Sequence, residues 1–185
     1  MILRVFVSVG TDHHPFARLI DWIDAWAAEH PDVALTVQHG SSPASVEGEN
    51  HVMMTSAELD EQYRGADIVV SQVGPGTIAD ANRADRMPIV VPRDPALGEV
   101  VDGHQYPFGE FMAAQGRCVM VTSEAQLREA LDRATSAPAT LRYEAAVGGS
   151  DAAAALGDLV ASVVAAPRRR LSWDRMAAML RRPDA

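Results

Sequence analysis

The chain has 185 residues, of which 48% are hydrophobic and 22% are charged, and this composition excludes an intrinsically disordered chain. A single cysteine, Cys118, excludes an internal disulfide and a cysteine-based zinc cluster. No apolar run reaches the roughly 18 residues that cross a bilayer, and residues 1–9 lack the features of a signal peptide. We therefore expect a cytoplasmic globular protein.

Charge is unevenly distributed along the chain. All 16 cationic side chains are arginines. Residues 167–185 hold six Arg and two Asp, a local net charge of +4, whereas residues 1–166 hold ten Arg and 23 acidic residues, a net charge of −13. The acidic body predicts that nucleic acid is not a partner, because phosphate binding depends on cationic side chains.

Strand and helix patterns alternate through most of the sequence. Apolar runs rich in β-branched residues predict strands at 2–9, 33–38, 52–54, 67–71, 88–91 and 118–121. Helical spacing and capping residues predict helices at 16–30, 56–64, from about 77, and at 104–115, 123–134, 151–166 and 171–182. The alternation predicts the α/β class, with a Rossmann-like, doubly wound parallel sheet over 1–166 and an extra basic amphipathic helix in 167–185.

Ligands of such sheets bind at the carboxyl ends of the strands, near the point where the strand order reverses. This rule selects the loops after Val9, Gln38, Ser71 and Val91. The residues able to do chemistry cluster in three of these loops. Met53 and Met54 lie outside these clusters, and we expect them in the core.

The loop after the first strand reads Gly10-Thr11-Asp12-His13-His14. A glycine and a hydroxyl there can present backbone N–H groups and an Oγ to a phosphate at the following helix N-terminus. Alternatively, Thr11 or Asp12 only caps the helix. The loop matches neither the glycine pattern of dinucleotide-binding proteins nor a P-loop, which requires a lysine.

The loop after residue 71 is a more specific signal. Gly74 and Gly76 flank Pro75 between a strand and a helix, and Thr77 lies near the helix start. Glycines allow close approach of an anion to free backbone N–H groups. Asp80, three residues beyond Thr77, can accept hydrogen bonds from a vicinal diol such as a ribose, or can simply favour the positive helix end.

The third cluster begins with Arg93 and ends with Asp102-Gly103-His104-Gln105. Arg93 is a candidate cation for a phosphate. His104 and Gln105, at a predicted helix start, offer imidazole and amide groups to a polyol. Asp102 can cap that helix without any other function.

Together the three clusters resemble the C-terminal, donor-binding half of family 28 glycosyltransferases. This family includes the single-domain catalytic subunit of the two-part N-acetylglucosaminyltransferase of dolichol-linked oligosaccharide synthesis and relatives in bacterial exopolysaccharide assembly. The matching stretches are 5–11, 37–42, 66–71, 74–80, 88–92 and 102–105.

The resemblance implies the C-terminal half of a GT-B fold, with a UDP-sugar as donor substrate. The positions that it assigns to the diphosphate are Gly10, Thr11, Gly74, Gly76 and Thr77. It assigns the ribose to Asp80, where Glu is more usual, and the donor sugar or ribose to His104 and Gln105. The chain departs from the family pattern at Gln72, where His is typical, and at Gly103, where Asn is typical.

From this resemblance we expect a catalytic, donor-binding subunit that acts with a membrane-anchored, acceptor-binding partner at the cytoplasmic membrane face. The candidate groups for stabilising the departing diphosphate are Arg93 as a cation and His13, His14 or His104 as donors, and we expect no metal and no cofactor besides the donor. The basic helix in 167–185 docks to the partner or the membrane surface, or packs back on the domain.

Two other functions stay open. One is a nucleotide-sugar-binding module without catalytic activity. The other is an NAD-dependent enzyme, which the missing Gly-x-Gly-x-x-Gly motif disfavours.

Overall fold

The computed structural model describes residues 2–144. The predicted helices at 151–166 and 171–182, and the domain boundary at residue 166, lie outside the described residues and stay predictions.

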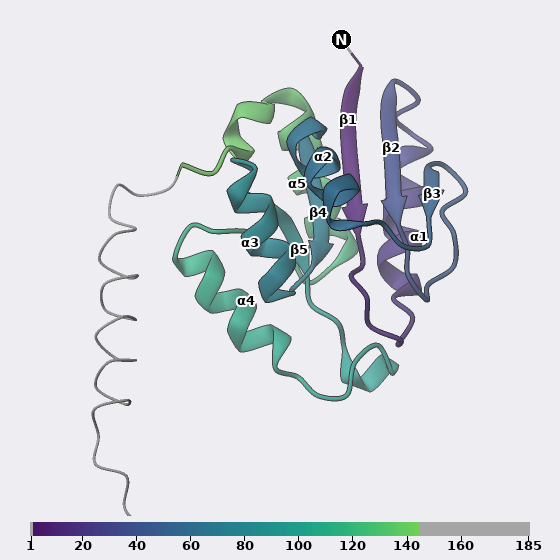
Figure 1. Cartoon of the computed structure of the whole chain (residues 1–185), viewed down its shortest axis with the longest axis vertical. Helices are drawn as coiled ribbons and strands as arrows, with labels where there is room; N and C mark the ends of the chain where they lie inside the picture. The colour runs from purple at the N-terminus through teal and green to yellow at the C-terminus, as the bar shows by residue number, and fades with distance from the viewer. Residues whose placement is uncertain (1, 145–185) are drawn as a thin grey trace, which may run out of the picture. The chain divides into compact units, whose positions relative to one another are not determined.

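A six-stranded parallel sheet forms the centre of the described chain (Figure 1). Its strands are β1 Leu3–Ser8, β2 Val33–Gln38, β3 Glu49–His51, β4 Ile68–Gln72, β5 Ile89–Val91 and β6 Val119–Met120. Their order is β3-β2-β1-β4-β5-β6, and each neighbouring pair is parallel. The chain builds outward from β1 in one direction and from β4 in the other, so the strand order reverses between these two strands. The predicted α/β class and doubly wound sheet are confirmed.

Helices cover both faces of the sheet (Figure 1). They are α1 Ala17–Ala27, α2 Ser56–Gly65, α3 Pro75–Arg83, α4 Gln105–Ala114 and α5 Glu124–Ser136, with short 3₁₀ helices at Pro95–Leu97 and Pro138–Leu141. Alternate residues of β1 point to opposite faces. Val5 and Val7 pack in the core with α1 and α5, whereas Phe6 packs with α2 and α3. The period of two in β1 therefore separates the two helical layers.

The strand predicted at 52–54 is wrong, because the edge strand β3 runs over three polar residues, Glu49–His51. Its backbone pairs with β2 from Thr36 to Gln38. An edge strand with polar side chains is held by backbone hydrogen bonds, and hydrophobic patterning does not reveal it.

Two helices also differ from the prediction at their amino ends, where Ser56 is expected to cap the helix through Arg64 and the next helix is expected from about Thr77. Thr55, not Ser56, caps α2, because its side chain accepts from the Glu58 N–H while Glu58 accepts from the Thr55 N–H. Helix α3 begins at Pro75 rather than near Thr77, since proline suits the first helical turn, where no N–H partner is needed. Asp80 consequently lies in the second turn of α3.

The single cysteine lies against α4. Cys118 is 3% exposed and packs with Val73, Ile78 and Val90. Burial raises the pKa of its thiol to about 11, which leaves little of the reactive thiolate at neutral pH.

We therefore expect the folded protein at pH 8 to react with a disulfide reagent on the order of 100-fold more slowly than the unfolded chain. The measurement is thiol reaction with Ellman's reagent in buffer and in urea at a denaturing concentration. Equal rates in the two conditions would contradict the burial of Cys118.

Candidate functional site

A cavity of about 310 Å³ opens at the carboxyl ends of β1 and β4, where the strand order reverses. This is the place that the parallel-sheet rule selects. Six residues predicted for the site line it, namely Gly10, Thr11, Gly74, Gly76, Thr77 and Asp80. The other lining residues are Ser8, Gln38, Met53, Met54, Leu59, Tyr63, Gln72 and Pro75.

The two glycine turns approach each other around the side chain of Gln72. Gly10 has a positive φ of 79°, which favours glycine. A Cβ added at Gly10 would lie 2.5 Å from Gln72 Nε2, and one added at Gly74 would lie 2.7 Å from the same atom. Both positions therefore require glycine for the Gln72 amide to lie between them.

The amino end of α3 borders the cavity with its first turn uncapped. Gly74 is the N-cap residue, and no side chain accepts a hydrogen bond from the first turn. The N–H groups of Gly76 and Thr77 have no partner within the helix, because the partners of the first turn would precede it. Such free N–H groups at the positive end of a helix dipole suit an anion.

Ser8 and Gln38 form a buried polar part of the cavity lining, and the sequence analysis did not predict that they belong to the site. Ser8 Oγ donates to Gln38 Oε1 at 2.7 Å, and Gln38 Nε2 donates to the carbonyls of Gly10 at 3.1 Å and Val52 at 3.2 Å. Both side chains are buried. This pair ties the Gly10 turn to the chain that follows β3.

Tyr63 reaches the same cavity from α2, although nothing in the sequence distinguished it from an ordinary core tyrosine. It is 2% exposed, and its ring and that of Phe6 form a T-shaped pair with centroids 5.3 Å apart. Burial raises the pKa of Tyr63 to about 12, and hydrogen bonding to Ser8 and Thr77 opposes this shift. The phenol therefore stays neutral and can donate a hydrogen bond at physiological pH.

One side of the cavity is apolar, formed by Met53, Met54 and Leu59. The prediction that Met53 lies in the core is wrong, because its side chain is 57% exposed. Met54 is partly buried and packs beside Tyr63. Thioether and aliphatic groups of this kind can adapt to the face of a planar ring.

Asp80 brings a carboxylate to the opening. Arg83 Nη1 donates to Asp80 Oδ1 at 2.8 Å, and both side chains are exposed. A second hollow of about 220 Å³ shares Asp80 and Tyr63 with the cavity. Thr77 and Asp80 both line the larger of these two cavities.

Arg93 does not line the cavity. Its side chain is fully buried and donates to three backbone carbonyls, those of Val9 at 2.8 Å, His14 at 2.7 Å and Glu99 at 2.9 Å. The guanidinium also lies 4.8 Å from the centre of the Phe16 ring. Burial lowers the pKa of Arg93, although the nearby carboxylates oppose this shift. In this arrangement the guanidinium joins the loops after β1 and β5 through Nη1 and Nη2, and its Nε is buried without a hydrogen-bond partner.

The carboxylate of Glu99 extends this junction. Arg18 donates to it through two nitrogens, at 2.7 and 3.0 Å, and the Asp94 N–H donates to it at 2.8 Å. Glu99 is 4% exposed. A buried carboxylate with three donors is well compensated, so the loop after β5 is firmly held.

Gln105 and His104 also lie outside the cavity lining. Gln105 is 4% exposed, and its amide bridges the Arg93 N–H and the side chain of Gln72. His104 is exposed and bonds to Asp102, which also accepts from the His104 N–H. Asp102 thus closes the turn just before α4.

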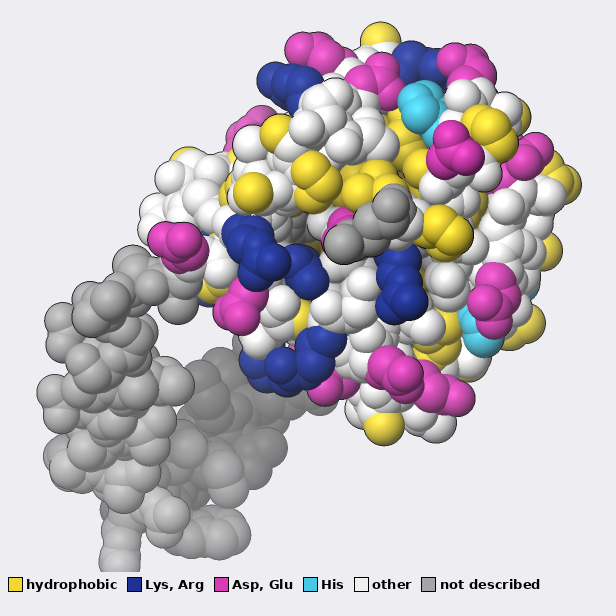
Figure 2. Space-filling view, turned by 90° about the horizontal axis from the view of Figure 1, so that it is seen from above, with side chains coloured by type: hydrophobic (Ala, Val, Ile, Leu, Met, Phe, Trp, Pro, Cys, Tyr) yellow, Lys and Arg dark blue, Asp and Glu magenta, His cyan; other side chains and the backbone are white. Residues whose placement is uncertain are grey.

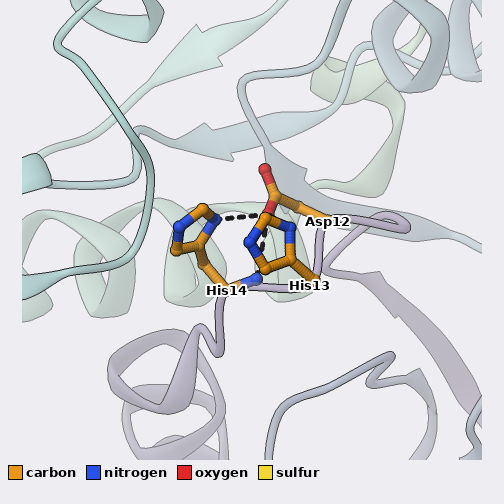
Figure 3. Close-up of side chains that lie close together, drawn as sticks. All are labelled: Asp12, His13 and His14. Carbon is orange, nitrogen blue, oxygen red and sulfur yellow. Dashed lines mark hydrogen bonds and ion pairs between the residues drawn. The ribbon is translucent and has the colours of Figure 1, made fainter.

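Asp12, His13 and His14 form a small cluster in the loop after β1 (Figure 3). His14 Nδ1 lies 2.7 Å and His13 Nδ1 3.5 Å from Asp12 Oδ1. Burial raises the pKa of Asp12, but hydrogen bonds from His14 and the charge of Arg93 outweigh it, so the net shift is downward. The three ligand atoms lie within 4.8 Å of one another and could hold a divalent cation. None of these residues lines the cavity.

A larger hollow, of about 930 Å³, lies along α5 and the 3₁₀ helix Pro138–Leu141. Its lining is mainly aliphatic, with charged side chains of α5 among it, and it contains neither glycine turn. The smaller cavity, at the carboxyl ends of β1 and β4, has the convergent polar groups of a binding site.

The opposite face, at the amino ends of the strands, carries charges of both signs. Acidic and basic side chains are interspersed there around hydrophobic ones (Figure 2).

The fold places the chain in a class of proteins whose parallel sheet matches the C-terminal half of GT-B glycosyltransferases. The kitacinnamycin glycotransferase matches with a TM-score of 0.57 and 19% identity, over 75% of this chain and 36% of that one. MurG of Acinetobacter baumannii matches with a TM-score of 0.52 and 16% identity, over 76% and 43%. The calicheamicin glycosyltransferase CalG4 matches with a TM-score of 0.51 and 15% identity, over 71% and 33%. The chain thus spans less than half the length of each of these proteins.

A sequence model of the glycosyltransferase family 28 C-terminal domain matches residues 4–147. The chain belongs to this family. No curated protein matches it at a significant level. Among the described residues, no helix combines the length and apolarity that a membrane crossing requires.

The buried arginine gives the first test of this site. We expect Arg93→Met to lower the free energy of unfolding by about 3 kcal/mol, because two buried carbonyls and one partly buried carbonyl lose their donor at about 1–3 kcal/mol each. Urea unfolding followed by circular dichroism measures the change.

Arg133→Met is the matched control, since Arg133 is 68% exposed and its salt bridge to Glu129 is on the surface. It should change stability by no more than about 0.5 kcal/mol. If the two variants lose similar amounts of unfolding free energy, the buried contacts of Arg93 contribute no more to stability than those of a surface arginine.

Proposed function

We propose that the chain is the donor-binding, catalytic part of a glycosyltransferase that uses a UDP-sugar. Membership of family 28 supports glycosyl transfer in general. The observation that carries the finer proposal is the cavity at the strand-order reversal, where two glycine turns, an uncapped helix end and a carboxylate converge.

The residues divide the cavity into three parts that fit the three parts of such a donor. The N–H groups of Gly76 and Thr77 would bind the diphosphate at the amino end of α3. Asp80 would accept hydrogen bonds from the ribose hydroxyls. The apolar side, with Met53 and Met54, would take the planar base.

In the transfer step, the bond between the anomeric carbon of the sugar and a β-phosphate oxygen breaks while an acceptor hydroxyl attacks that carbon. Negative charge grows on the departing UDP, and the fixed N–H groups of α3 would stabilise it without reorganising. His13 and His14 stay proposed as additional donors to the phosphates. The base that takes the acceptor's proton is proposed to come from a partner.

The structural neighbours are each more than twice as long as the part that aligns with this chain. We infer that a membrane-anchored subunit supplies the acceptor site, with a lipid-linked or polysaccharide acceptor at the cytoplasmic membrane face. The basic residues 167–185 are proposed to dock to that subunit or to the membrane surface.

UDP selectivity tests the proposed donor. UDP should raise thermal stability, by about 2.7 kcal/mol at 100 times its dissociation constant, and ADP, GDP and NAD should have much smaller effects. The measurement is differential scanning fluorimetry of the full chain, with and without EDTA, and the UDP effect should survive EDTA. Stabilisation by NAD instead of UDP would overturn the proposed function. If the chain binds UDP but transfers no sugar in the presence of the partner subunit, a regulatory module is favoured.

Asp80 gives the second test. Asp80→Ala should weaken UDP binding by about 1–3 kcal/mol, because a charged acceptor for the ribose is lost. Isothermal titration measures the affinity, and Asp21→Ala, an exposed carboxylate on α1, is the matched control. If both variants bind UDP like the wild type, Asp80 does not hold the ribose.

A further inference from the structure

We propose that Gln72 is the neutral amide donor to the diphosphate, and that Gln105 is a positioning residue that fixes which end of the Gln72 amide faces the cavity. The proposal rests on the proposed function, since it assigns a residue to the diphosphate of the same site.

The direction of the amide follows from one backbone group. The Arg93 N–H can only donate, so the Gln105 atom 2.9 Å from it must be Oε1. Gln105 Nε2 is then directed to Gln72, and because it donates, the atom that receives it at 3.0 Å must be Gln72 Oε1. The remaining end of the Gln72 amide is therefore the NH₂ group.

That NH₂ group lies where an anion is expected. It occupies the space between Gly10 and Gly74, whose missing Cβ atoms leave room for it. Gln72 lines the cavity, and within residues 2–144 its side chain makes one hydrogen bond, through Oε1, which leaves Nε2 without an acceptor. Two N–H bonds of Gln72 and the free N–H groups at the start of α3 thus border one cavity, which suits a diphosphate better than a neutral ligand.

The two hydrogen bonds that lead from the Arg93 N–H through Gln105 to Gln72 form a relay, and this relay starts at a rigid group. Arg93 carries the N–H that starts it, and its own guanidinium is fixed by three carbonyls. Gln105 uses both ends of its amide within the relay and is 4% exposed, so its side chain is held inside the protein rather than presented to the cavity. The structure therefore assigns Gln105 an indirect role in place of the expected direct contact.

One substitution of nearly the same shape, Gln105→Glu, should reverse the orientation of the Gln72 amide. In Gln105→Glu, one oxygen of the introduced carboxylate still accepts from the Arg93 N–H, but the other cannot donate to Gln72. The Gln72 amide should turn over, so that its Nε2 donates to the introduced carboxylate and its Oε1 faces the cavity. An oxygen in that place repels a phosphate.

The experiment is a double-mutant cycle on the full chain at pH 8, with Gln72→Met, Gln105→Glu and the double variant. Gln72→Met keeps the side-chain length and removes the amide. We expect about tenfold or greater loss of affinity for UDP and inorganic pyrophosphate in either single variant, since each removes a hydrogen bond to a charged ligand. The double variant should bind them like Gln72→Met alone, and uridine affinity should stay within about twofold in all variants.

The cycle separates a relay from the plain effect of a new negative charge. If Gln105→Glu weakens pyrophosphate binding equally in the Gln72→Met background, the charge acts directly and the relay is overturned. Gln105→Met, which breaks the relay without a charge, should give a smaller loss, again for pyrophosphate and not for uridine. Thermal unfolding of each variant confirms that it is folded.

The outcomes also separate this inference from the proposed function. If the wild-type chain binds neither UDP nor pyrophosphate, the proposed donor site itself is contradicted. A wild-type chain that binds UDP, together with Gln72→Met and Gln105→Glu variants that bind it equally well, would leave the donor site standing and overturn the relay.

Discussion

The guanidinium of Arg93 holds together the two loops from which the site is built. It donates to carbonyls of the loop after β1, at Val9 and His14, and of the loop after β5, at Glu99. A buried cation with three carbonyl partners is costly to desolvate and costly to displace, so it defines one arrangement of these loops. The Gly10 turn and the start of α4 are positioned relative to this junction.

The resulting site handles an anion mainly with neutral groups. The body of the chain is strongly acidic, and the cation expected to meet the phosphate is occupied with backbone carbonyls. In the proposed site its place is taken by helix N–H groups at Gly76 and Thr77 and by the amide of Gln72. Fixed dipoles of this kind are effective because they are already oriented when charge develops.

Much of this arrangement could be predicted from the sequence, for local reasons. The buried strands show as β-branched apolar runs, and Gly10, Gly74 and Gly76 mark turns at strand ends. The parallel-sheet rule then brings the Gly10 and Gly74 turns to one edge, where the structure places them. The edge strand β3 and the exposed Met53 could not be predicted, because polar edge pairing and a cavity wall leave no periodic signal.

The sequence by itself determined the fold class, the glycine turns and the position of Asp80, since these depend on patterning and on residue types with special backbone freedom. Only the tertiary structure decided which polar side chains face the cavity. Arg93 and Gln105 are typical ligand-binding residue types, yet both are buried and joined to groups far along the chain. Tyr63 carried no sequence signal and Gln72 only a departure from the family pattern, and both reach the cavity because packing brings separate elements together at β1 and β4.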